Sequence, residues 1–455
     1  MKRLLRTVVA VTVIGMLVAA SGFAGGQGEE GDGAQEDVTI RLGLLARGIS
    51  DAIQPFVPEF EEQTGMDVEI EQHAYDSLRD KMTLEFAAGS GYFDVVYLSP
   101  GYLGELVAND YIMPLNDLMA EQGFAREDFM DAALRISQYG DSDRIWGFPY
   151  LADTSILLYR KDLFNDADER AAFQDEYGYE LPIPSVDNPI TTDEFLDLAE
   201  FFTRDGMWGY GYPQTGVAYG NLHIMPWIWT FGGEYYDSDL EATLNTPASV
   251  EAVRFAKELQ TYQPEGALGW NYGDHITRFY EGDLAMVQGW FHMGLEANDP
   301  EQSNIAGNVG YAPTPYHPDT GEDHGRTVLG GGSVAITADS ENPEAAFQFL
   351  NWMFGDTERA LEWYLNGGGA TRPEIYEHPR VTDEYPWAEE FFPVANYALA
   401  NTARQRPTLP IANEMFEVMA QMWDEVALGR TSPEEGVESA HEQLSELLTE
   451  YRTSN

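Results

Sequence analysis

Asp153 and Trp290 have the chemistry to hold a hydroxylated ligand without reacting with it. Asp153 comes just before the apolar run Ser155–Tyr159, which places one carboxylate at the mouth of a buried strand. A carboxylate accepts two hydrogen bonds, and such charge-assisted bonds are strong. Trp290 ends the segment Gly282–Trp290, and an indole ring covers the apolar C–H face of a sugar ring. The alternatives are a surface or capping aspartate, among 77 acidic residues, and a core tryptophan, among 10.

Alternating strands and helices in the first part of the chain predict where further ligand contacts lie. The expected elements are a strand over Val38–Leu45, a helix over Ala52–Thr64, a strand from Met66, a helix over Tyr75–Ala88, a strand over Phe93–Leu98 and a helix over Tyr102–Asn109. This order predicts a parallel sheet in an α/β domain. Because ligands bind beyond the carboxyl ends of such strands, Arg47, Ser99 and Tyr102 are candidates.

Gly330, Gly331 and Gly332 interrupt a strand predicted over Val328–Ile336. Their spacing does not match a phosphate-binding loop, since no Lys-Ser/Thr pair follows in register. Glycines inside a strand indicate the close approach of another backbone or of a ligand, so Gly330 and Gly331 are candidates. Helices are predicted at Thr191–Phe202, Thr246–Thr261, Asn342–Phe354, Asp356–Asn366, Ile411–Leu428 and Pro433–Arg452.

Arg372 follows a second glycine run, Gly367–Gly369, and is cationic in a strongly acidic chain. It either hydrogen-bonds a ligand or closes a buried ion pair. Metal binding is not indicated: His317 and His324 flank a loop that is better explained as polar surface, and no H-E-x-x-H motif is present. The sequence leaves a structural calcium ion undecided.

The composition excludes several classes of function. The 455 residues carry a formal net charge of −52, which repels nucleic acid and anionic membranes. The acidic residues are spread along the chain, as on a solvated surface whose self-repulsion salt would screen, so we hypothesise adaptation to salt. With no cysteine, disulfides, thiolate nucleophiles and Cys-ligated metals are excluded.

Residues 1–24 have the pattern of a secretory signal peptide. Lys2, Arg3 and Arg6 precede the apolar core Val8–Ala20, and residues 25–36 are polar and glycine-rich, as in a flexible tether. An uncleaved anchor is the alternative. No cysteine follows the core, so a lipobox is excluded. We expect a soluble protein exported to the periplasm.

Four phrases, in this order and spacing, resemble family 1 extracellular solute-binding proteins, the sugar-binding components of ABC importers that include maltose-binding proteins. They are Phe60–Val68, Ala87–Val96, Tyr111–Leu115 and Ile145–Phe164. The resemblance covers roughly residues 38–452. It implies an α/β, two-lobed periplasmic-binding-protein fold of type II, the Venus-flytrap fold, with hinge segments crossing between the lobes. The expected N-terminal lobe takes 37–150 and 329–375, and the C-terminal lobe takes 151–328 and 376–455.

The resemblance also implies roles for individual residues. Asp153 and Trp290 match ligand-binding positions of the family, and Asp153 lies in Ile145–Phe164, the segment expected to cross first between the lobes. In the family, the strand that matches Val328–Ile336 lines the cleft between the lobes. Tyr150, in the bend before Asp153, is a further candidate, as are Asn221, His223 and Trp227, although core packing is the alternative for these last three.

The implied function is capture of a mono- or oligosaccharide by hinge closure and its delivery to an ABC permease, by a monomer that needs no cofactor. A polyol or a polyamine is the alternative ligand, and a receptor that presents sugar to a chemosensor is another class. An acidic cleft disfavours anionic solutes, which would need an arginine cluster. A secreted glycoside hydrolase is a remote alternative, because paired carboxylates carry no information among so many acids.

Overall fold

The computed structural model describes residues 38–140, 143–204 and 206–454. The expected signal peptide, 1–24, and the tether, 25–36, lie outside the described residues. Within the described part, no helix combines the length and the apolar character needed to cross a membrane.

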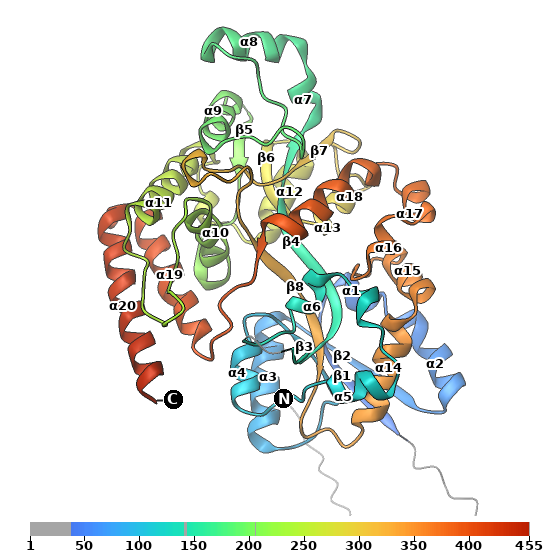
Figure 1. Ribbon diagram of the computed structural model, residues 1–455. Helices are drawn as coiled ribbons and strands as arrows, with labels where there is room; N and C mark the ends of the chain where they lie inside the picture. Colours follow the sequence, from blue (N-terminus) through green and yellow to red (C-terminus); the bar gives the residue numbers. More distant parts are fainter. Residues whose placement is uncertain (1–37, 141–142, 205, 455) are drawn as a thin grey trace, which may run out of the picture. The chain divides into compact units, whose positions relative to one another are not determined.

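One mixed sheet runs through the described part in the order β2-β1-β3-β8-β4-β6-β5, with β7 on β4 and β9 on β8 (Figure 1). The strands are β1 (Thr39–Leu45), β2 (Asp67–His73), β3 (Val95–Leu98), β4 (Phe148–Arg160), β5 (Trp208–Gly211), β6 (Leu284–Trp290), β7 (Val309–Ala312), β8 (Thr327–Ile336) and β9 (Ala403–Arg404). The pairs β1–β2 and β1–β3 are parallel, which confirms the parallel arrangement predicted for the first strands.

The long strands β4 and β8 connect the two halves of this sheet. Phe148–Thr154 of β4 pairs antiparallel with β8, whereas Ser155–Tyr159 pairs with β6. In β8, Leu329–Val334 pairs with β4, and Ser333–Ile336 pairs with β3. Each strand therefore changes partner along its length. Gly331 has φ of 86°, a left-handed conformation that favours glycine.

The first helices show how proline divides a helical pattern. The helix predicted over Ala52–Thr64 is wrong as a single element: the structure has α1 (Gly48–Asp51), the 3₁₀ turn η1 (Gln54–Phe56) and α2 (Val57–Thr64). Pro55 and Pro58 each stand near the start of a new segment, where their missing N–H costs nothing. By contrast, α3 spans Tyr75–Ala88 as predicted and ends at Gly89, with φ of 56°.

Later helices follow their capping signals. Thr191 and Glu194 form the capping box of α9 (Thr192–Phe202), and Thr246 caps α11 (Pro247–Leu259). Several helices were not predicted, and the longest of them is α10 (Gly216–Thr230), which contains Pro226 and is apolar on nearly all sides. The other long helices are α8 (Ala167–Tyr177), α12 (Tyr272–Glu281), α14 (Pro343–Gly355), α15 (Thr357–Leu365), α18 (Ala388–Tyr397), α19 (Ala412–Ala427) and α20 (Pro433–Ser454).

The hydrophobic core consists of three clusters of buried side chains. One surrounds β1, β2 and β3 and includes α14. A second joins α9, α10, α11, α19 and α20. The third lies around β6, β7 and α18. Residues of β4 contribute to all three, which makes this strand the element that the separate cores share.

Candidate functional site

Asp153, Trp290 and Gly330 come together where β4, β6 and β8 meet. Asp153 is opposite Gly330 in the β4–β8 ladder, and Trp290 is opposite Ser155 in the β4–β6 ladder. A Cβ atom at position 330 would collide with the indole ring of Trp290, so the ring lies directly against that glycine. The sequence singled out these residues from separate signals, and the fold makes them neighbours.

The Asp153 carboxylate is held by backbone groups. Its Oδ1 accepts a hydrogen bond of 3.0 Å from the N–H of Phe291, the residue that precedes the short helix α13 (His292–Glu296). Asp153 is only 6% exposed. Burial raises its pKa to about 7, against the opposing effects of the Phe291 and Thr154 N–H groups and the charge of Arg47. Asp153 therefore also fixes the turn that carries Trp290.

Residues that lie after β1, or in and after β3, form a second group of polar contacts, one of which reaches Gly331 of β8. The hydroxyl of Tyr97 donates a 2.9 Å hydrogen bond to the carbonyl oxygen of Gly331. Arg47, which is exposed, lies over the Tyr97 ring with its Cζ 5.5 Å from the centroid. The buried Ser99 pairs its hydroxyl with that of Tyr75 at 3.0 Å, and Tyr75 lies against the ring of Tyr102.

Two residues that the sequence did not single out lie beside this site. His292 follows Trp290 and Phe291, and its Nε2 is 3.2 Å from the hydroxyl of Tyr272, at the start of α12 (Tyr272–Glu281). Although the His292 side chain is accessible to solvent, desolvation by surrounding protein and the charge of Arg47 lower its pKa to about 4. The imidazole is thus neutral at pH 7 and can both donate and accept a hydrogen bond.

Arg406 is a further residue that the sequence analysis missed. It follows β9 and stacks over Phe416, with its Cζ 5.9 Å from that ring. Its charge also acts on Tyr97, because Arg406 and Arg47 both oppose the rise that burial causes in the pKa of Tyr97. Its buried Nε has no hydrogen-bond partner among the described residues. No local sequence signal marks it.

Arg372 and Tyr150 are engaged in the protein interior. The Arg372 side chain donates to the carbonyl oxygens of Phe354 and Gly355 and pairs with Asp128 at 3.2 Å. These bonds favour an ion pair over the ligand contact that was the alternative expectation, although only the Arg372 side of the pair is buried. Tyr150 is 2% exposed and lies 3.2 Å from the hydroxyl of Ser50. Neither side chain faces solvent.

Asn221, His223 and Trp227 lie on α10 and are buried in the cluster that joins α10 to α19. The His223 ring lies 5.0 Å from that of Trp423, and burial lowers its pKa to about 3. The core-packing alternative therefore describes all three in this structure.

Hydroxyl groups join three chain segments next to the site. The hydroxyl of Thr154 in β4 is 2.7 Å from that of Thr327 in β8, which is 3.0 Å from that of Thr402 in the π-helical turn η6 (Ala398–Thr402).

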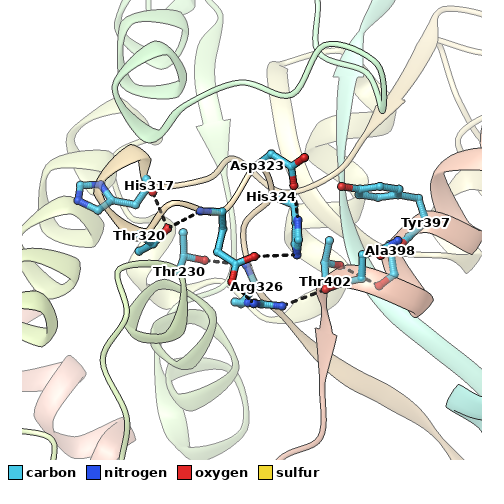
Figure 2. Close-up of polar contacts among 11 residues, drawn as sticks. Thr230, His317, Thr320, Asp323, His324, Arg326, Tyr397, Ala398 and Thr402 are labelled. Atoms are coloured by element: carbon cyan, nitrogen blue, oxygen red, sulfur yellow. Dashed lines mark hydrogen bonds and ion pairs between the residues drawn. The ribbon is translucent and has the colours of Figure 1, made fainter.

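Figure 2 shows the surrounding polar contacts. The backbone N–H of Arg326 donates to the Thr230 hydroxyl, and its guanidinium group donates to the carbonyl oxygen of Asn401 and to the Glu322 carboxylate. His317 and His324 lie in the segment between β7 and β8 that precedes Arg326. No described group of His, Asp and Glu has a metal-binding arrangement. The β4–β8 junction is thus linked to η6.

These features define a mixed α/β protein of the periplasmic-binding-protein class, with a polar site at the strands that join its halves. The sequence pattern of the bacterial extracellular solute-binding proteins matches residues 47–360. This chain belongs to that family, whose members bind solutes and are not catalysts.

Curated relatives carry names for different solutes. The chain is 25% identical to a probable amino-acid ABC transporter periplasmic-binding protein of Sinorhizobium fredii over 340 residues, 72% of this chain and 71% of the relative. It is also 25% identical to the mannitol-binding protein of Pseudomonas aeruginosa over 342 residues, 73% of this chain and 72% of the relative.

Solved structures show the same fold. A solute-binding protein from Agrobacterium radiobacter in complex with ribitol has a TM-score of 0.76 and 24% identity, covering 90% of this chain and 98% of the other. Maltose-bound MalE3 of T. maritima has a TM-score of 0.74 and 22% identity, covering 90% of this chain and all of the other, 100%. These likenesses confirm the type II fold expected from the sequence.

Proposed function

We propose that this protein captures a carbohydrate or polyol outside the cytoplasm and delivers it to an ABC importer. The observation that carries the proposal is the meeting of Asp153 and Trp290 at Gly330. One buried carboxylate can accept hydroxyl hydrogen bonds while the adjacent indole ring covers a C–H face. The names of the mannitol-binding and maltose-bound relatives support hydroxylated ligands, whereas the amino-acid relative supports a solute that also carries a carboxylate.

The proposed mechanism is closure of two lobes over the ligand. One lobe takes residues 37–150 and 329–375, and the other takes 151–328 and 376–455. Ligand contacts from both lobes favour the closed form by their differential affinity for the two states. The changes of strand partner in β4 and β8 support this division, because both strands pass between the halves of the sheet.

The proposal includes export and monomeric action in the periplasm. The signal-like residues 1–24 support export. The net charge of −52 supports adaptation to salt, and unfolding at low and molar ionic strength tests that part. Equal stability at both would contradict it.

A thermal-shift screen of the mature protein tests the function. A ligand that binds only the native state raises the unfolding temperature, and the gain in stability grows with the logarithm of its concentration over Kd. We expect a shift with at least one sugar, polyol or sugar derivative. A shift with putrescine or spermidine alone, or release of reducing ends from a polysaccharide, would contradict the proposal. Asp319→Ala, on the exposed loop after β7, is the matched control for substitutions at Asp153.

A further inference from the structure

Arg47 and Arg406 belong to the minority of described arginines that lie in no ion pair. Most described arginines lie within ion-pair distance of a carboxylate, as in Arg41–Glu69, Arg160–Asp162 and Arg404–Glu234. Among the described residues, neither Arg47 nor Arg406 has such a partner. Their guanidinium groups therefore lack a described acidic countercharge, although the chain has a formal net charge of −52.

The two arginines lie near β3 and the loop that follows it, and the positive charges of both act on Tyr97. Arg47 comes from the loop after β1 and lies over the ring of Tyr97. Arg406 comes from the segment after β9, and its Nη1 is 3.8 Å from the position that a Cβ on Gly101 would take. The positive charges of both arginines oppose the rise that burial causes in the pKa of Tyr97. The hydroxyl of Tyr97 donates a hydrogen bond to the carbonyl oxygen of Gly331. The charge of Arg47 also acts on Asp153, which links this pair to the proposed site.

An arginine pair of this kind has a specific chemical use. A guanidinium group presents several N–H donors in a plane and matches the two oxygens of a carboxylate, and the bond strengthens where water is excluded. Arg406 also has a buried Nε–H without a described acceptor, and a buried donor left unpaired is costly. An anionic ligand group would satisfy that donor and supply the missing countercharge.

We propose that the site takes an anionic polyhydroxylated solute, a sugar acid, whose carboxylate lies between Arg47 and Arg406 while its hydroxyls reach Asp153 and Trp290. This inference rests on the proposed function and narrows its substrate class. It departs from the expectation that an acidic chain disfavours anionic solutes, since the local charge at the site differs from the net charge. Burial raises the pKa of Asp153 to about 7, which reduces repulsion of the ligand by that group.

Matched ligand pairs provide the test. Isothermal titration of the mature protein compares ribitol with ribonate and glucitol with gluconate, pairs that differ mainly by the carboxylate. We expect the aldonates to bind at least about tenfold more tightly, with a preference that declines as salt rises. Arg47→Met and Arg406→Met should each remove most of this preference, whereas Arg47→Lys should keep part of it. Arg254→Met, at an exposed ion pair with Glu434, is the charge-matched control and should keep the preference.

The outcomes separate this inference from the proposed function. If the alditols bind as tightly as the aldonates, or more tightly, the sugar-acid inference is wrong and the proposed function stands. If a polyamine binds and none of the polyhydroxylated compounds does, both are wrong. If the aldonate preference survives both methionine substitutions, the carboxylate is held elsewhere and the assignment to Arg47 and Arg406 fails.

Discussion

Replacing Asp153 by asparagine should change how the stability of the protein depends on pH. The folded protein raises the pKa of this carboxyl from 3.8 to about 7, chiefly by burial. Between these values the native state holds a proton that the unfolded state has lost. The free energy of unfolding of the wild type therefore falls as pH rises through this window. Asparagine cannot ionise, yet its side-chain oxygen can still accept the Phe291 N–H.

The size of the effect follows from the pKa difference. At about 1.4 kcal/mol for each pH unit, the interval from 3.8 to about 7 corresponds to about 4 kcal/mol in total. From pH 5 to pH 8 the wild type should lose about 3 kcal/mol relative to Asp153→Asn, because other titrating groups cancel in the comparison.

Urea unfolding of both ligand-free proteins at several pH values measures this difference. The Asp319→Asn variant serves as the control, since its exposed side chain should give a constant difference from the wild type. A wild-type minus Asp153→Asn difference that does not change between pH 5 and pH 8 would refute the conclusion that burial opposes ionisation of Asp153.

The remaining predictions concern other parts of the molecule. Burial lowers the pKa of His223 from 6.5 to about 3, so the free energy of unfolding should fall as pH falls below 6.5. In thermal unfolding at pH 4.5, His223→Gln should lose less stability relative to neutral pH than the wild type does. Equal losses in the two proteins would contradict this prediction. Arg372→Met should destabilise the fold by about 3 kcal/mol in urea without weakening ligand binding, since it leaves the carbonyl groups of Phe354 and Gly355 without their charged donor; a binding defect at unchanged stability would favour a ligand contact instead. A Cβ at Gly104 would collide with the carbonyl oxygen of Thr408, so Gly104→Ala should oppose closure of the proposed lobes and weaken ligand affinity about tenfold or more. Gly269→Ala, whose Cβ would lie in open space, should leave the affinity unchanged. Equal affinities of the two variants in titration would contradict this prediction.

The sequence carried enough information for most of the local elements. The helix Tyr75–Ala88 and the capping box at Thr191 were predictable because their signals, an apolar period ended by glycine and an N-cap with Glu three positions on, are local. The division of the first helix depended on Pro55 and Pro58, whose effect the apolar period concealed.

The site was predictable only in part, for a physical reason. Asp153 and Trp290 each border an apolar strand, which is a signal within the chain. Arg406 lies near Gly101 after β9 has paired with β8, a tertiary contact that no local pattern specifies. Likewise, burial of Arg372 depends on the carbonyl groups at the end of α14.

Titration of wild-type protein and of Asp153→Ala with sugars, polyols and aldonates tests the role of this carboxylate most directly. We expect the wild type to bind at least one of these compounds with a stoichiometry of one. Loss of charge-assisted hydrogen bonds should weaken that binding by roughly 10- to 100-fold in Asp153→Ala, while Asp319→Ala binds as the wild type does. Binding to Asp153→Ala with unchanged affinity, or the absence of binding by every compound to the wild type, would contradict the assignment of a hydroxyl-binding site to the junction of β4, β6 and β8.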